Sequence, residues 1–140
     1  GLVNLSNKQE EREAKESVQR LEELSGRYKG NEEIALTYAK GLVNLSVDQG
    51  EREAKESVQR LEELSGRYKG NEEIAFAYGQ GLFNLSNKQE EREAQESVRR
   101  LEELSEKYKG NEEIRLLYAQ GRANLSAEQK KRFKESGKLK

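Results

Sequence analysis

The apolar positions of this chain follow two patterns that alternate along it. In the first pattern, apolar residues are spaced 4, 3, 3 and 4 apart, which predicts a helix with one narrow buried stripe. In the second pattern, over residues 34–45, apolar residues fall on nearly all sides. A helix of that kind is usually packed between neighbours. The stripe of the first pattern consists of Ala54, Val58, Leu61, Leu64 and Tyr68.

The striped segment is predicted to form the longer helix of each pair. It begins at Ser46, and Gln49 three residues later completes an S-x-x-Q capping box. We expect the helix to run to about Lys69 and to end at Gly70 in a left-handed turn. The box recurs at Ser6/Gln9, Ser86/Gln89 and Ser126/Gln129. Three pairs spaced i, i+4 with the acid first predict ion pairs on a solvated face: Glu51–Lys55, Glu56–Arg60 and Glu63–Arg67.

The second pattern predicts a shorter helix that ends near Leu45. Asn31 is its N-cap, and Glu32 and Glu33 occupy the first turn, where the helix dipole favours acids. Asn71 and Asn111 take the same place in the later copies. A glycine lies in the middle of this helix in three copies, which favours close approach by a neighbouring helix over a break. These glycines are Gly41, Gly81 and Gly121.

The two helices belong to one repeating unit. We expect the whole chain, residues 1–140, to form one repeat domain. Repeats 1–40 and 41–80 differ at seven positions, namely 7, 8, 10, 36, 37, 39 and 40. Repeats 81–120 and 41–80 differ at twelve, and 121–140 is a partial, capping copy that loses the pattern by Phe133. One unit cannot bury its own apolar side, so neighbouring units must stack. The predicted fold class is all-α.

Composition argues against catalysis. Only 32% of the residues are hydrophobic and 38% are charged, but 26 Lys and Arg balance 27 Asp and Glu in a helical pattern. That pattern is typical of solvated helix faces. The absence of Cys and His removes disulfides, thiolates, the commonest general base and the commonest metal ligand. With no phosphate-binding glycine loop either, we expect no enzyme, no cofactor and no metal site.

The ends of the chain suggest where it works. No apolar run approaches the ~20 residues of a membrane span and no signal peptide is visible, so we expect a cytoplasmic protein that does not enter a membrane. The chain starts inside a copy and without Met, as an excised or processed piece would.

The last segment of the chain, "QKKRFKESGKLK", has six bases and one acid. A basic tail can bind nucleic acid or acidic lipid, but we favour a polar helix that caps the array and expect no nucleic-acid partner.

The unit resembles a lengthened tetratricopeptide repeat. In "IALTYAKGL", Tyr38, Ala39 and Leu42 are similar to the first-helix signature of that family, and Ala54, Val58 and Leu61 resemble its second-helix series. "KGN" stands where the family has a terminal proline. The resemblance implies a right-handed superhelical array of antiparallel helix pairs, an α-solenoid.

The resemblance also implies a concave groove, lined by the shorter helices, that binds a peptide or protein segment. Several implied groove positions are among those where the copies differ, which a ligand-facing surface explains better than neutral drift between tolerant core positions. The implied residues are Glu33, Leu36, Lys40, Val43, Asn44, Glu73, Phe76, Gln80, Phe83, Asn84, Glu113, Leu116, Gln120, Ala123 and Asn124.

A column of asparagines allows two interpretations. The residues recur once in every copy, as Asn4, Asn44, Asn84 and Asn124. They form either a ladder of amides for the backbone of a bound strand or, as we favour, partners for the free carbonyls at the end of each shorter helix.

The sequence therefore predicts a protein–protein interaction module. The alternative is a structural spacer, or a self-associating or idealised repeat scaffold without a dedicated ligand. Because the first longer helix lacks most of its partner, we expect the open N-terminal end to pair with another copy, as a dimer or a head-to-tail stack.

Overall fold

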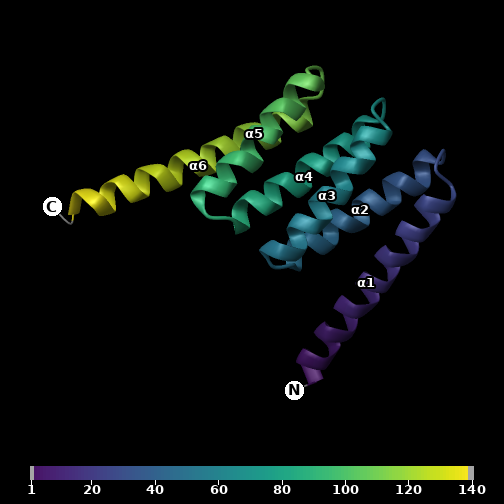
Figure 1. Ribbon diagram of the computed structural model, residues 1–140. Coiled ribbons are helices and arrows are strands. Elements are labelled where there is room, and N and C mark those ends of the chain that lie inside the picture. Colours follow the sequence, from purple (N-terminus) through teal and green to yellow (C-terminus); the bar gives the residue numbers. More distant parts are fainter. Residues whose placement is uncertain (1, 139–140) are drawn as a thin grey trace.

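The computed structural model describes the backbone of residues 2–138 and, within that range, the side chains of residues 8–128 and of Lys131. This part of the chain forms six α-helices and contains no strand, which confirms the all-α prediction (Figure 1). The helices are α1 (Leu2–Arg27), α2 (Glu32–Asp48), α3 (Glu51–Arg67), α4 (Glu72–Lys88), α5 (Glu91–Lys107) and α6 (Glu112–Lys138).

The helices form an array of repeats in which each one packs against the next in sequence. The even helices also pack on one another, α2 on α4 and α4 on α6. Within the described residues no odd helix packs on another odd helix in this way. The even helices therefore form a continuous layer, and the odd helices lie against it on the other side (Figure 1).

The core lies between these two layers. All five residues of the predicted stripe, four on α3 and Tyr68 directly after it, are buried, with Ala54 and Leu61 fully excluded from solvent. Helix α4 is buried on nearly every side, as its apolar pattern predicts. Its buried residues are Ile74, Ala75, Ala77, Tyr78, Gly79, Gly81, Leu82, Leu85 and Ser86.

The three glycines in the middle of the even helices mark close helix contacts and do not break the helices. A methyl group added at Gly81 would lie 2.6 Å from Leu61 Cδ1 on α3. The equivalent distances are 3.2 Å at Gly41, to Val18, and 3.3 Å at Gly121, to Val98. The packing interpretation is thus confirmed, and Gly81 is the tightest of the three.

The capping-box prediction is wrong. Ser46 lies inside α2, where its hydroxyl donates to the Val43 carbonyl at 2.7 Å, and Gln49 caps the C-terminus of that helix. The side chain of Gln49 instead accepts from Ser57 at 2.9 Å and so ties the two helices of the hairpin together. Interior helices α2 to α5 consequently all have 17 residues, rather than alternating short and long.

The predicted helix end at Gly70 also needs correction. Helix α3 ends at Arg67, and the C-cap Tyr68 donates its N–H to the Leu64 carbonyl. Within the described residues no glycine adopts a positive φ, so the turn does not depend on left-handed backbone. Among the described side chains the three predicted i, i+4 ion pairs of α3 do not form, and Arg60 instead pairs with Glu22 on α1.

The first and last helices run straight through the place where interior hairpins turn. Residues 4–14 and 84–94 have the same sequence, NLSNKQEEREA. In the interior this sequence breaks between α4 and α5, whereas at the start of the chain it lies within the continuous helix α1. Helix α6 likewise continues past Ser126, so neither of the outer capping boxes begins a helix. Local sequence alone therefore does not determine the break.

Candidate binding surface

The even helices are positioned by an asparagine at each N-cap. The Asn31, Asn71 and Asn111 side chains accept from the backbone N–H three residues later, at 3.0 to 3.1 Å, as predicted. Each cap fixes where its helix begins relative to the preceding loop. Equivalent residues of α2, α4 and α6 therefore form rows that cross the stacked even helices.

One such row is apolar, and its last member is the most exposed. Leu36 on α2 and Phe76 on α4 are half-buried and touch the core, whereas Leu116 on α6 is 60% exposed. Phe76 also lines a hollow of about 490 Å³ between the first turns of α4 and α6. These three residues define what we call the apolar row. They offer a line of hydrophobic contacts at one place in each even helix.

An acidic rim borders the apolar row. The first turns of α2, α4 and α6 carry two exposed glutamates each: Glu32, Glu33, Glu72, Glu73, Glu112 and Glu113. Among the described side chains none of these six makes an ion pair. The helix N-termini favour the negative charge on these acids. The rim therefore presents charges that are available to a basic partner.

The other groove residues implied by the sequence lie further along the even helices and are not equally accessible. Val43 is 8% exposed and belongs to the core cluster. Phe83 is half-buried, with Cδ2 3.9 Å from where a methyl group on Gly121 would lie. The remainder are exposed or half-buried: Lys40, Asn44, Gln80, Asn84, Gln120, Ala123 and Asn124.

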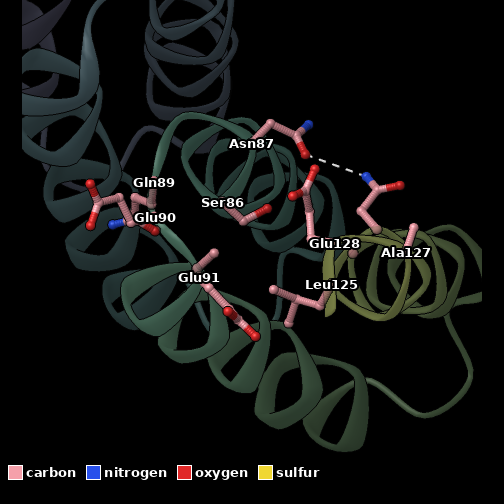
Figure 2. A pocket seen from close by; sticks show the side chains of 11 residues that line it. Ser86, Asn87, Gln89, Glu90, Glu91, Leu125, Ala127 and Glu128 are labelled. Atoms are coloured by element: carbon pink, nitrogen blue, oxygen red, sulfur yellow. Dashed lines mark hydrogen bonds between the residues drawn. The ribbon is translucent and has the colours of Figure 1, made fainter. Parts of the chain in front are cut away.

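The asparagine column has a role that neither interpretation anticipated. Asn84 donates its amide to Ser46 Oγ on the preceding even helix at 3.3 Å. Asn124 donates in the same direction to Asn87 Oδ1, also at 3.3 Å (Figure 2). These amides join neighbouring units, rather than serving the carbonyls of their own helix. The side chain of Asn4 lies outside the described residues.

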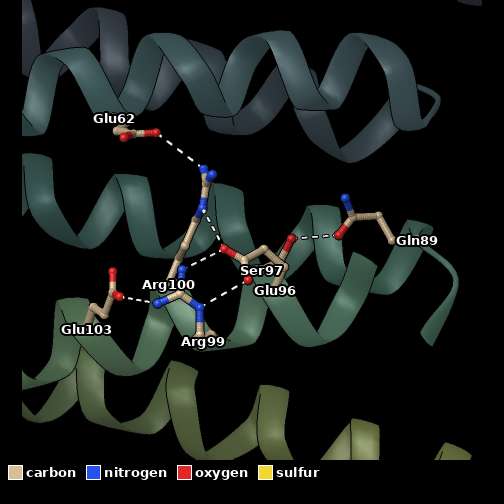
Figure 3. A network of polar contacts seen from close by, with 7 residues as sticks. All are labelled: Glu62, Gln89, Glu96, Ser97, Arg99, Arg100 and Glu103. Carbon is tan, nitrogen blue, oxygen red and sulfur yellow. Dashed lines mark hydrogen bonds and ion pairs between the residues drawn. The ribbon is translucent and has the colours of Figure 1, made fainter. Parts of the chain in front are cut away.

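A second set of polar contacts joins the odd helices across each repeat boundary. Arg100 on α5 pairs with Glu62 on α3 at 3.4 Å, and Arg60 repeats this contact with Glu22 (Figure 3). Tyr108 donates its hydroxyl to the Lys69 carbonyl at 2.8 Å, and Tyr68 does so to Lys29. The charged groups are 42 to 54% exposed, so their main contribution is to fix the register between units.

Tyrosines on the even helices lie beside these boundary contacts. Burial, with a smaller effect from Glu62, raises the pKa of Tyr78 to about 12. The Tyr118 hydroxyl donates directly to Glu102 at 2.5 Å, and this hydrogen bond raises the pKa of Tyr118. Sequence analysis missed these contacts. They could have been recognised from an acid and an arginine that are the same number of residues apart in successive copies.

Two clefts lie between an odd helix and the even helix that follows it. The cleft between the α4–α5 turn and α6 has a volume of about 430 Å³, and Ser86, Ala94 and Leu125 contribute to its lining (Figure 2). The corresponding cleft between α1 and α2 is larger, about 830 Å³, and its lining includes Ala14, Val18 and Leu45. Ser86 comes from the end of α4.

No group of three or more acidic side chains is suited to hold a metal ion within the described part of the chain. Among the described helices, none offers an apolar stretch that could span a membrane.

Comparison of the chain with models of protein families, with curated proteins and with solved structures finds no match. The site must therefore be interpreted from its own chemistry.

Proposed function

We propose that this protein is an interaction module of tetratricopeptide-like, superhelical architecture that binds a protein segment across its even helices. The observation that carries the proposal is the apolar row, because its three hydrophobic side chains occupy one equivalent position on successive helices. A bound segment would cover Leu36, Phe76 and Leu116 in turn. Burial of apolar side chains is the main source of affinity in such interfaces.

The acidic rim indicates the charge of the partner. A segment that lies on the apolar row passes the unpaired glutamates of α2, α4 and α6, so basic residues beside its apolar anchors gain favourable electrostatics. We therefore expect a partner segment that combines large apolar residues with Lys or Arg. Gln80 and Gln120 offer side-chain amides for backbone groups of that segment.

The test is selection of peptides from a displayed random library on the wild-type chain, followed by affinity measurements with the enriched peptides. Phe76→Glu places a charge in the middle of the apolar row, so we expect at least a tenfold loss of affinity, about 1.4 kcal/mol. Gly66→Glu is the matched control, because Gly66 is exposed on α3 and the third unit has Glu106 at that position.

The selection also has outcomes that contradict the proposal. Enriched peptides that bind the Phe76→Glu and wild-type chains equally well would place the ligand elsewhere. Failure to enrich any peptide would overturn the module and leave the spacer function. The helical circular dichroism of both variants shows whether the fold is intact.

A further inference from the structure

Helix α6 carries a regularly spaced line of exposed residues on its outer face. Successive members are 3, 4, 3 and 4 residues apart, and we call them the α6 seam: Glu113, Leu116, Gln120, Ala123 and Ala127. This spacing is typical of the contact line along which two helices pack. The two alanines are small, so a second helix can approach closely.

The α6 seam lies on a face that is open in the interior units too. Val47 on α2 and Asn87 on α4 correspond to Ala127, and both are exposed. Lys40 on α2 corresponds to Gln120 and is exposed as well. The face is therefore not the one by which an even helix packs on the next unit.

The two ends of the seam carry opposite charges. Glu112 and Glu113 of the acidic rim lie at its start, and among the described side chains neither makes an ion pair. Helix α6 continues beyond the seam into a basic stretch, residues 130–134, with the sequence KKRFK. Lys131 in this stretch is exposed. The helix therefore has an acidic and a basic end that complement each other.

One molecule cannot bring these two ends together while α6 is intact. Glu113 and Lys131 belong to a single continuous helix and are about 27 Å apart along its axis. The end of α6 also projects beyond the neighbouring α5 (Figure 1). The complementary charges can therefore meet only between two molecules.

We propose that two copies of the chain pair through the α6 seam, with their α6 helices antiparallel about a two-fold axis midway between Gln120 and Ala123. In this register Gln120 of one copy lies level with Ala123 of the other, and Leu116 lies level with Ala127. The two-fold axis makes every contact occur twice. Leu116 of each copy is removed from water, which favours the dimer.

The same register matches the charges. It places Glu112 of one copy level with Lys131 of the other. Residues 130–133 as a whole lie level with residues 110–113, which contribute to the lining of the hollow of about 490 Å³. Opposite charges at both ends favour this antiparallel order. A parallel pair in register would instead place acid beside acid and base beside base.

The dimer goes beyond the proposed function, because it needs no foreign segment. It covers Leu116 and the α6 part of the acidic rim, which the proposed partner segment also uses. A second copy and a partner segment therefore compete for one face, so binding of the segment separates the two copies.

Reversal of charge tests the pairing. Acids meet acids in a dimer of Lys130→Glu/Lys131→Glu, and bases meet bases in a dimer of Glu112→Lys/Glu113→Lys. We expect light scattering to show a monomer–dimer equilibrium for the wild-type chain, and a dissociation constant at least tenfold higher for each double variant alone. An equimolar mixture of the two variants should dimerise again, because opposite charges then meet at both ends.

Glu32→Lys/Glu33→Lys is the matched control. It makes the same change of net charge as Glu112→Lys/Glu113→Lys, but in the equivalent first turn of α2, outside the seam. This variant should dimerise like the wild-type chain. High salt should weaken the wild-type dimer, because it screens the charges at the two ends of the seam. Helical circular dichroism shows whether each variant keeps its fold.

A wild-type chain that stays monomeric, or that grows beyond a dimer, would overturn the pairing. So would a mixture that is no more dimeric than its two components. The variant Lys130→Glu/Lys131→Glu separates this result from the proposed function, because it keeps the apolar row and the acidic rim. If both proposals hold, this variant binds the selected peptides more tightly than the wild-type chain does. Peptide binding without any wild-type dimer would overturn the pairing alone.

Discussion

At the scale of single residues, the mid-helix glycines show how one absent methyl group sets the distance between two helices. A methyl group at Gly81 would meet the fully buried side chain of Leu61 at 2.6 Å, whereas at Gly41 the nearest atom is 3.2 Å away. In both places alanine would otherwise favour the helix by about 1 kcal/mol. The balance between helix propensity and overpacking therefore differs between the two sites.

We expect Gly81→Ala to lower the free energy of unfolding by ~1 to 3 kcal/mol, because Leu61 has no space to move into. Gly41→Ala should be neutral or stabilising by up to about 1 kcal/mol, because Gly41 faces the open cleft beside α1. Urea denaturation of both variants measures the difference. Equal stabilities would mean that helix contacts do not distinguish these glycines.

Glu51 gives a second prediction at this scale, from a contact between two acids. A hydrogen bond to Glu93, then burial and the charge of Glu93, raise the pKa of Glu51 above its ordinary value. A group whose pKa is raised by folding stabilises the folded state while it is protonated, and this contribution is lost as the pH rises through the raised pKa.

We therefore expect the stability of Glu51→Gln to exceed that of the wild-type chain at neutral pH, where the amide removes the repulsion between the two acids. The advantage should shrink as the pH falls through the raised pKa. Thermal unfolding across the acidic range measures this trend. An advantage that does not change with pH would assign the effect to something other than the ionisation of Glu51.

At the scale of elements, the hairpin turn depends on a bond that bridges it. Ser97 is 5% exposed and donates to Gln89, and Ser57 donates to Gln49 in the same way. Loss of either hydroxyl leaves the amide oxygen of the glutamine without its donor. Such a loss typically costs about 1 kcal/mol.

Ser57→Ala and Ser97→Ala should each destabilise the chain by about 1 kcal/mol in urea. Ser17→Ala is the matched control at the same position of α1, where the residue is exposed and no hairpin turns back. At concentrations that keep the chain monomeric, we expect Ser17→Ala to be neutral. A cost at Ser17 as large as that at Ser97 would contradict the role of the turn.

Much of the element structure could be predicted from the sequence, because the causes are local. The apolar stripe of α3, the Asn31 cap and the buried character of α4 all follow from side-chain spacing. The S-x-x-Q box failed because its serine also bonds within a helix, as Ser46 does. Since residues 4–14 and 84–94 are identical yet differ in structure, the break is not decided by local sequence alone.

The candidate site could be predicted only in part, for a similar reason. The sequence was sufficient to place Leu36, Phe76 and Leu116 in one row, because they occupy the same position in successive units. It could not show that Val43 is buried or that Asn84 bonds to Ser46, because these depend on side chains of the neighbouring unit.

At the scale of the whole molecule, α6 carries polar side chains where the interior even helices are apolar. Its uncovered side has Arg115 and Arg122, both exposed, at positions where α4 has Ala75 and Leu82. The polar side removes the apolar surface that would bind a further unit.

The double variant Arg115→Ala/Arg122→Leu restores the apolar residues of the interior even helices. It should therefore create an apolar surface on α6 that can bind another molecule. We expect this double variant to associate end to end through α6 and α1, with a mass in light scattering that rises beyond a dimer as the concentration increases. The single variant Arg115→Lys keeps the charge and should behave like the wild-type chain. A double variant with unchanged mass would show that the arginines do not prevent stacking.

The near-identity of the units has a consequence for how the chain reaches this structure. Residues 11–35 and 51–75 have the same sequence, so while the chain folds the α4 segment meets two chemically equal partners, its native neighbour α3 and the distant α1. A hairpin formed with the wrong one is a kinetic trap, and it must open before the correct arrangement can form. The copies differ at positions such as Val43, Phe83 and Ala123. These differences then give the native pairing of helices a different energy from a pairing that is shifted by one unit.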